Sequence, residues 1–132
     1  MTTISTDSRL LLVDDNPDDR ALVARELRKD MPGIGITEVL DLSALDTVLE
    51  AGAFDLVITD FYLHWITGLE VLKRVKIRWP EVPVIMFTGT GTEEVAVEAM
   101  RLGLSDYVVK APRHMMRLFH GRRAGAVQGR YP

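Results

Sequence analysis

Short apolar segments alternate with amphipathic segments along most of the chain. Most of the apolar segments are continuous runs, which is typical of strands buried on both faces of a parallel sheet. In the amphipathic segments apolar residues recur every three or four positions, which predicts helices with one buried face. The predicted strands cover residues 9–14, 34–40, 54–59, 82–87 and 106–110, and the predicted helices cover residues 17–30, 42–51, 68–79, 92–102 and 112–119. Strict alternation of this kind predicts an α/β fold, with parallel strands, right-handed crossovers and helices on both faces of the sheet.

Capping and breaking residues mark the helix boundaries. Asn16 and Pro17 have the types preferred at the N-cap and the first helical position. Thr92 is a second N-cap candidate, and acidic residues follow it in the first turn. Gly52 and Gly103 stand where two helices should end.

Length and composition narrow the class of protein. A chain of 132 residues predicts one domain. We expect an N-terminal tail over residues 1–8, the domain over 9–120 and a flexible basic tail over 121–132. The absence of cysteine excludes a disulfide framework, a zinc ribbon and a thiol nucleophile.

Hydropathy gives no sign of a membrane segment. The longest apolar runs, residues 10–13 and 82–87, are far shorter than the ~20 residues that a spanning helix needs. Residues 1–8 lack the basic start and the apolar stretch of a signal peptide. We therefore expect a cytoplasmic protein without membrane association.

Charge is divided unevenly along the chain. Residues 1–110 carry 19 Asp and Glu against 11 Lys and Arg, a balance of −8, whereas residues 111–132 carry five Arg and no acid. The basic tail lacks interleaved aromatic residues and a helix-turn-helix pattern. Direct binding of nucleic acid is therefore not expected.

Polar residues stand at the carboxyl ends of four predicted strands. They are Asp14 with Asp15, Asp60, Thr88 and Lys110. Ligands of parallel α/β sheets bind beyond these ends, so the side chains should lie close together. Three carboxylates in one cleft repel each other unless a cation binds, and oxygen ligands suit Mg²⁺. A carboxylate nucleophile with a metal, a lysine and a hydroxyl suits phosphoryl transfer.

Each of these residues also has an ordinary structural explanation. An acidic pair after a strand often caps the next helix, and a lone Asp often belongs to a turn. A lone lysine is usually solvated. The combination at four strand ends favours the functional interpretation.

The chain resembles the receiver domains of response regulators in two-component signalling from about residue 9 to residue 119. The stretches that carry the resemblance are Leu-Leu-Val-Asp-Asp-Asn (11–16), Asp-Leu-Val-Ile-Thr-Asp (55–60), Gly-Leu-Glu-Val-Leu (68–72), Pro-Val-Ile-Met-Phe-Thr-Gly (83–89) and Ser-Asp-Tyr-Val-Val-Lys (105–110). The resemblance implies a flavodoxin-like, doubly wound sheet of five parallel strands in the order 2-1-3-4-5.

The resemblance also implies a role for each site residue. Asp60 would be the phosphoacceptor. Mg²⁺ would be bound by Asp60, directly by Asp15, through water by Asp14, and by the backbone carbonyl of Tyr62. Thr88 and Lys110 would hold the phosphoryl group, and Tyr107 would turn inward as the switch residue when Thr88 moves. The structural alternative for Tyr107 is an edge aromatic that never moves.

The implied partner is a sensor histidine kinase or a histidine phosphotransfer protein, and the implied function is a phosphorelay switch rather than an enzyme. A homodimer is compatible with the resemblance. In receivers, the residues two positions after the phosphoacceptor and two positions after the hydroxyl residue flank the path of the hydrolytic water. In this sequence they are Tyr62 and Thr90. Because Tyr62 is bulky and Thr90 is short, we expect slow self-dephosphorylation.

Three other functions compete. A phosphohydrolase of the haloacid dehalogenase type also uses a strand-end Asp with Mg²⁺, but Tyr62 stands where its second Asp is required. A flavin carrier would need a phosphate-binding loop where Asp14 and Asp15 stand. An interaction module without phosphorylation would not need the complete set of site residues.

The sequence departs from the receiver pattern in two short motifs and in its last predicted helix, which is short. Leu63-His64 replaces the usual Met-Pro, and Lys110-Ala111-Pro112 replaces the usual Lys-Pro. Because the residue directly after Lys110 is not a proline, a cis prolyl bond in this segment would have to join residues 111 and 112. His64 and the other two histidines, His114 and His120, are expected to be solvated residues. Trp65 follows Asp60 by five positions and should report cation binding by fluorescence.

Overall fold

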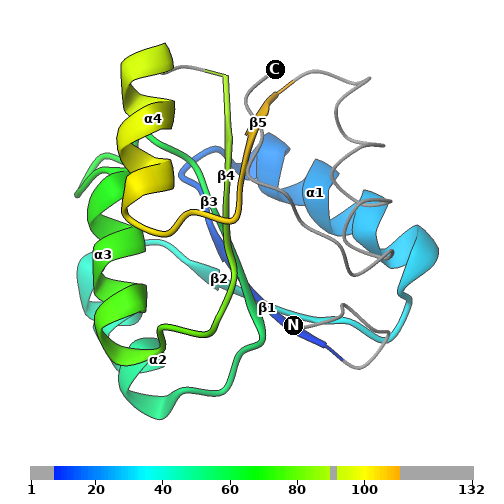
Figure 1. Cartoon of the computed structure of the whole chain (residues 1–132). Helices are drawn as coiled ribbons and strands as arrows, with labels where there is room; N and C mark the ends of the chain where they lie inside the picture. Colours follow the sequence, from blue (N-terminus) through cyan, green and yellow to red (C-terminus); the bar gives the residue numbers. More distant parts are fainter. Residues whose placement is uncertain (1–7, 90–91, 111–132) are drawn as a thin grey trace.

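The computed structural model describes residues 8–89 and 92–110, and its centre is a parallel sheet. The strands lie in the order β2-β1-β3-β4-β5, as the resemblance implied (Figure 1). Their bounds are β1 (Arg9–Val13), β2 (Gly35–Val39), β3 (Leu56–Thr59), β4 (Val84–Thr88) and β5 (Asp106–Val109). The three central strands β1, β3 and β4 have almost only buried residues, which is why their sequences are continuous apolar runs.

The described residues form four helices, which cover both faces of the sheet (Figure 1). Their bounds are α1 (Pro17–Asp30), α2 (Leu42–Ala51), α3 (Gly68–Arg78) and α4 (Glu93–Arg101). On one face, Val23 and Leu27 of α1 form a hydrophobic cluster with residues of β1, β3, β4 and β5. On the other face, buried residues of α2, α3 and α4 form the second and larger cluster.

The predicted boundaries differ slightly from the observed ones. The strand predicted over residues 54–59 begins at Leu56, and the strand predicted over 82–87 covers Val84–Thr88. Phe54 is buried although it precedes β3, because its ring packs edge-on against Trp79 at 6.4 Å between centroids. Because Phe54 is buried although it lies outside β3, the apolar segment in the sequence is longer than the strand.

The predicted capping residues stand at the helix ends. The Asn16 side chain accepts hydrogen bonds from the backbone N–H groups of Asp18 and Asp19. Thr92 accepts one from Val95. Gly52 ends α2 with a φ of 71°, a left-handed conformation that favours glycine.

Several sequence predictions fall outside the described residues. These are the helix over 112–119, the tail over 121–132, the prolyl bond at 111–112, Thr90, and the histidines His114 and His120. Of the predicted N-terminal tail, the structure describes Ser8, which is buried and accepts a hydrogen bond from the N–H of Gly35. In the described part of the chain, no helix has the length and apolar character needed to cross a membrane.

The strand order determines where the site lies. β1 has β2 on one side and β3 on the other. The chain therefore adds β2 on one side of β1 and all later described strands on the other side, so the strand order reverses at β1. The segment after β1 leads into α1 on one face, and the segment after β3 leads to α3 on the opposite face (Figure 1). A crevice opens between such diverging connections at the carboxyl ends of the strands.

Candidate functional site

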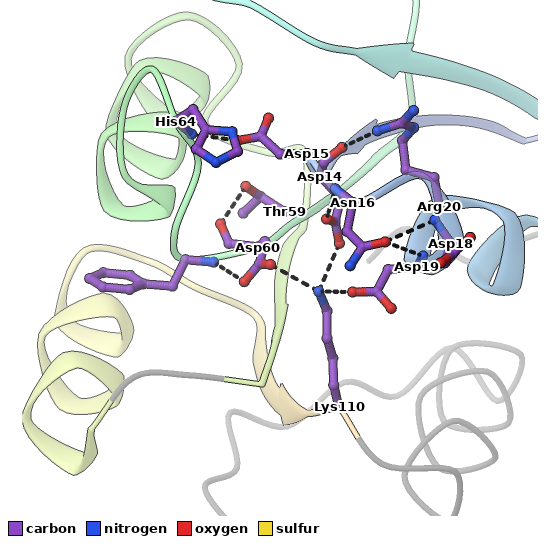
Figure 2. Close-up of polar contacts among 11 residues, drawn as sticks. Asp14, Asp15, Asn16, Asp18, Asp19, Arg20, Thr59, Asp60, His64 and Lys110 are labelled. Atoms are coloured by element: carbon purple, nitrogen blue, oxygen red, sulfur yellow. Dashed lines mark hydrogen bonds and ion pairs between the residues drawn. The ribbon is translucent and has the colours of Figure 1, made fainter.

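The ammonium group of Lys110 lies at the centre of the strand ends (Figure 2). Its Nζ is 2.9 Å from Oδ2 of Asp14, 2.9 Å from Oδ2 of Asp60 and 2.8 Å from Oδ2 of Asp19. The structure thus brings together three residues selected from the sequence, Asp14, Asp60 and Lys110. Asp19, in the first turn of α1, joins them. We call these four residues the Lys110 cluster.

The charges of the Lys110 cluster perturb one another. Burial raises the pKa of Asp14, and this outweighs the hydrogen bond from the N–H of Asn16 and the attraction of Lys110. Burial by itself lowers the pKa of Lys110, but the hydrogen bonds to Asp19, Asp60 and Asp14 overcome that effect and raise it. Lys110 is therefore a firmly protonated cation, and three carboxylates around one cation leave the cluster with surplus negative charge.

Asp60 is held at the end of β3 by both backbone and side chain. Its N–H donates to the carbonyl of Val13 at 2.9 Å, which continues the pairing of β3 with β1. Its Oδ1 accepts from the N–H of Phe61 at 2.6 Å, while Oδ2 accepts from Lys110. The hydroxyl of Thr59 donates to the carbonyl of Asp60 at 2.9 Å. The carboxylate is thus fixed in orientation.

An open pocket of about 480 Å³ adjoins this carboxylate. Its walls include Asp14, Asp15 and Asp60 from the strand ends, Asp19 from α1, and Tyr62 from the segment after β3. A small anionic group could reach Asp60 through this pocket only if its charge were compensated, because half of the lining residues are acidic.

Thr88 and Tyr107 are both buried. Thr88 is the last residue of β4, and its carbonyl accepts from the N–H of Lys110 at 2.9 Å, which ties the ends of β4 and β5 together. Tyr107 is 2% exposed and belongs to the larger hydrophobic cluster, together with Ala96 and Ala99 of α4. Tyr107 is therefore a core residue in this conformation, and its predicted movement stays a prediction.

Asp15 faces away from the Lys110 cluster (Figure 2). Its Oδ2 accepts from the backbone N–H of His64 and lies 3.1 Å from Nδ1 of the same residue. Its Oδ1 accepts from the indole Nε1–H of Trp65 at 3.1 Å. The two neighbouring acids thus serve different partners. His64 is exposed, as expected, but the prediction that it is only a solvated residue missed its bonds to Asp15.

Tyr62 lies in the segment between Asp60 and α3. An isolated antiparallel bridge joins it to Thr67, through hydrogen bonds that use the carbonyls of Phe61 and Ile66 rather than its own. Tyr62 is 62% exposed, and its ring packs edge-on against that of Phe61 at 4.7 Å between centroids. The covering of a phosphoryl group by this ring stays a prediction.

The oxygen donors at this site have the chemistry that Mg²⁺ prefers. Among the described residues, however, no three acidic or histidine side chains converge closely enough to hold a metal ion as they stand. The reasons are visible in the contacts, since Lys110 lies between Asp14 and Asp60 and Asp15 is held by His64 and Trp65. The donor set fits the ion, provided that Asp15 turns toward the other two acids.

Comparison with known proteins identifies the family. The family model described as the response regulator receiver domain matches residues 10–119. This chain belongs to that family. Receiver domains are signalling domains of two-component systems, so the match favours the receiver prediction over the phosphohydrolase and flavin-carrier alternatives.

Relatives of this receiver domain include short and long proteins. It is 38% identical over 106 residues to the response regulator protein FleR of Pseudomonas aeruginosa, covering 78% of this chain and 21% of FleR. It is 30% identical over 104 residues to the chemotaxis protein CheY of the same organism, covering 77% of this chain and 83% of CheY. The crystal structure of NtrX from Brucella abortus superposes with a TM-score of 0.76 at 28% identity, over 92% of this chain and 27% of that chain. This receiver domain therefore spans most of CheY but only a minor part of FleR and NtrX.

Proposed function

We propose that this receiver domain accepts a phosphoryl group on Asp60 from a phosphohistidine and changes conformation in response. The observation that carries the proposal is the Lys110 cluster, in which the Asp60 carboxylate lies beside an open pocket with one oxygen on Lys110 and the other on the N–H of Phe61. A carboxylate fixed in this way is positioned as a nucleophile.

The proposed transfer gives each residue a task. An oxygen of Asp60 attacks the phosphorus, and the bond from phosphorus to the donor imidazole breaks. Lys110 then exchanges part of its contact with carboxylates for contact with the phosphoryl oxygens, where negative charge collects. Thr88 supplies a hydroxyl from the neighbouring strand end, and its movement toward the phosphoryl group is the proposed signal that Tyr107 follows.

Asp14, Asp15, Asp60 and the carbonyl of Tyr62 are the residues that we propose for holding Mg²⁺. When bound, the ion would neutralise charge on the phosphoryl oxygens. The surplus negative charge of the Lys110 cluster supports this assignment, because a single ammonium cannot balance three carboxylates.

The partner that this chemistry requires is a phosphohistidine-bearing protein, namely a sensor histidine kinase or a histidine phosphotransfer protein. We propose a cytoplasmic switch that controls a partner or an output domain, with Mg²⁺-dependent self-phosphorylation and slow self-dephosphorylation as its only chemical reactions. The long relatives FleR and NtrX support control of an output, since their receiver-like part is a fraction of the protein.

Phosphorylation of the full chain by a small phosphodonor tests this proposal. Intact-mass measurement in the presence of Mg²⁺ should show one added phosphoryl group in the wild type and none in Asp60→Asn. Asp55→Asn is the matched control, since Asp55 precedes the same strand at its other end and pairs with Arg9. Phosphorylation of the Asp60→Asn variant at an aspartate to the wild-type extent would falsify the assignment.

A further inference from the structure

The segment between Asp60 and α3 forms a tight turn that points at Asp15. The N–H of Leu63 donates to the carbonyl of Ile66 at 3.2 Å, which makes His64 and Trp65 the two central residues of the turn. Both residues donate to the same carboxylate, His64 through its backbone N–H and Trp65 through its indole N–H. Both oxygens of Asp15 are therefore engaged by one turn.

The turn is anchored, so these donors are preorganised. The Tyr62–Thr67 bridge closes its base, and the N–H of Gly68 donates to the carbonyl of Phe61 at 2.6 Å. The side chains of Leu63, Trp65 and Ile66 pack against the larger hydrophobic cluster. The indole of Trp65 is thus fixed by packing on one side and by its hydrogen bond to Asp15 on the other.

We propose that Trp65, supported by His64, is a positioning residue that holds Asp15 away from the metal site and must release it when the cation binds. The inference rests on the proposed function, in which Asp15 is a metal ligand. It follows from two observations: both Asp15 oxygens serve the turn, and no group of three described acidic or histidine side chains could hold a metal ion as it stands. Cation binding is then coupled to the turn that leads into α3.

Trp65 contributes more to this hold than the imidazole of His64. The His64 side chain is 94% exposed, and an ion pair in water contributes little. The Trp65 indole is partly shielded from water, and a hydrogen bond to a charged acceptor is stronger where water competes less. The backbone N–H of His64 is retained in any side-chain variant, so substitution can weaken the hold without abolishing it.

Calorimetric titration of Mg²⁺ into the full chain measures how strongly Trp65 competes with the cation for Asp15. We expect Trp65→Phe to tighten Mg²⁺ binding about fivefold, equal to ~1 kcal/mol, because one hydrogen bond no longer has to be broken. His64→Ala should tighten it by less than about twofold. Trp79→Phe is the matched control, since it removes an indole N–H that donates to Leu49 at 2.7 Å in another part of the protein, and it should leave the affinity unchanged.

A fluorescence titration gives a second readout. The chain has two tryptophans, so Trp79→Phe leaves Trp65 as the sole emitter. Its emission should shift as the indole leaves the Asp15 carboxylate. The midpoint of this shift should fall at the same Mg²⁺ concentration as the midpoint of the calorimetric titration. Unchanged emission at saturating Mg²⁺, or a Trp65→Phe variant that is folded by circular dichroism and binds Mg²⁺ no more tightly than the wild type, overturns the proposal.

The Asp15→Asn variant separates the assignment of Asp15 as a metal ligand from the competition by Trp65. If Mg²⁺ binding is unaffected in Asp15→Asn, the assignment of Asp15 as a ligand is wrong, and the proposed metal site is wrong with it. If Asp15→Asn loses binding but Trp65→Phe gains none, the metal site stands and only the competition by Trp65 is wrong.

Discussion

The two edges of the sheet use similar residues to opposite effect. At the edge where the strands begin, Arg9 pairs with Asp55 at 3.5 Å, and both side chains are well exposed. At the edge where they end, Lys110 pairs with Asp14 and Asp60, and these side chains are mostly shielded from water. One edge carries a solvated ion pair, and the other carries four charges that are mostly shielded from water.

The chemistry of these carboxylates depends on their surroundings more than on their pairing. Asp55 and Asp60 flank the same strand, and each accepts a hydrogen bond from a backbone N–H and forms an ion pair with a cation. Only Asp60 shares its cation with two other acids and adjoins a pocket. Surplus charge and restricted access to water support the reactivity proposed for the carboxyl edge, whereas the Arg9–Asp55 pair at the amino edge is structural.

Removal of the cation at each edge should give the largest contrast. Lys110→Met leaves three carboxylates without their ammonium, so we expect the free energy of unfolding to fall by about 3 kcal/mol. Arg9→Met should lower it by less than ~1 kcal/mol, because that pair is exposed. Urea denaturation of both variants measures the difference. Equal losses would mean that the two edges do not differ electrostatically.

A methyl group added at each edge should sharpen the contrast in packing. A Cβ at Gly68 would collide with the backbone carbonyl of Asp60, so we expect Gly68→Ala to lower stability by about 2 kcal/mol and to slow phosphorylation. The control is Gly35→Ala beside Arg9, where the nearest atom lies 3.7 Å from the added Cβ. This variant should be neutral or more stable by about 0.5 kcal/mol. Both can be compared by thermal unfolding, and a harmless Gly68→Ala would contradict the close approach of α3 to Asp60.

The smallest expected effect is a pH dependence at the carboxyl edge. Burial raises the pKa of Asp14 above its ordinary value of 3.8, so the folded protein binds more protons at this site than the unfolded chain between 3.8 and the raised value. The contribution of Asp14 to stability therefore improves as pH falls from neutral toward 3.8. Urea denaturation at several pH values should show that the free energy of unfolding of the wild type rises relative to that of Asp14→Asn as pH falls over this interval. The Asp55→Asn difference should change less, and a gain of wild type with rising pH would reverse the sign we assign to Asp14.

The fold followed from local signals in the sequence. Continuous apolar runs identified most of the strands, and Asn16, Gly52 and Thr92 marked helix ends by capping chemistry that depends on a few neighbouring residues. Strand-end positions also indicated that Asp14, Asp60 and Lys110 would meet. These inferences succeeded because the period of hydrophobic residues and the polarity of parallel strands leave few alternatives.

The contacts that the sequence did not predict depend on side-chain direction. Asp19 reaches Lys110 because the first turn of α1 begins beside β1, which its spacing from Asn16 could have suggested. Nothing in the sequence showed that Asp14 and Asp15 would face different partners, or that the turn at His64 and Trp65 would hold the second acid. Such choices are decided by packing between segments about 50 residues apart, which a local pattern does not record.

The distance along the chain between Lys110 and its partners sets an order of assembly. Lys110 lies 96 residues after Asp14 and 50 residues after Asp60. It reaches them only when β5 has paired with β4, and that pairing is one of the last contacts available to a chain made from its N-terminus. Until then the nascent domain carries Asp14, Asp19 and Asp60 without their common cation. The pairing of β5 with β4 therefore completes the described sheet and the Lys110 cluster in one event, so a chain that has not finished folding cannot present the paired form of Asp60, the proposed phosphoacceptor.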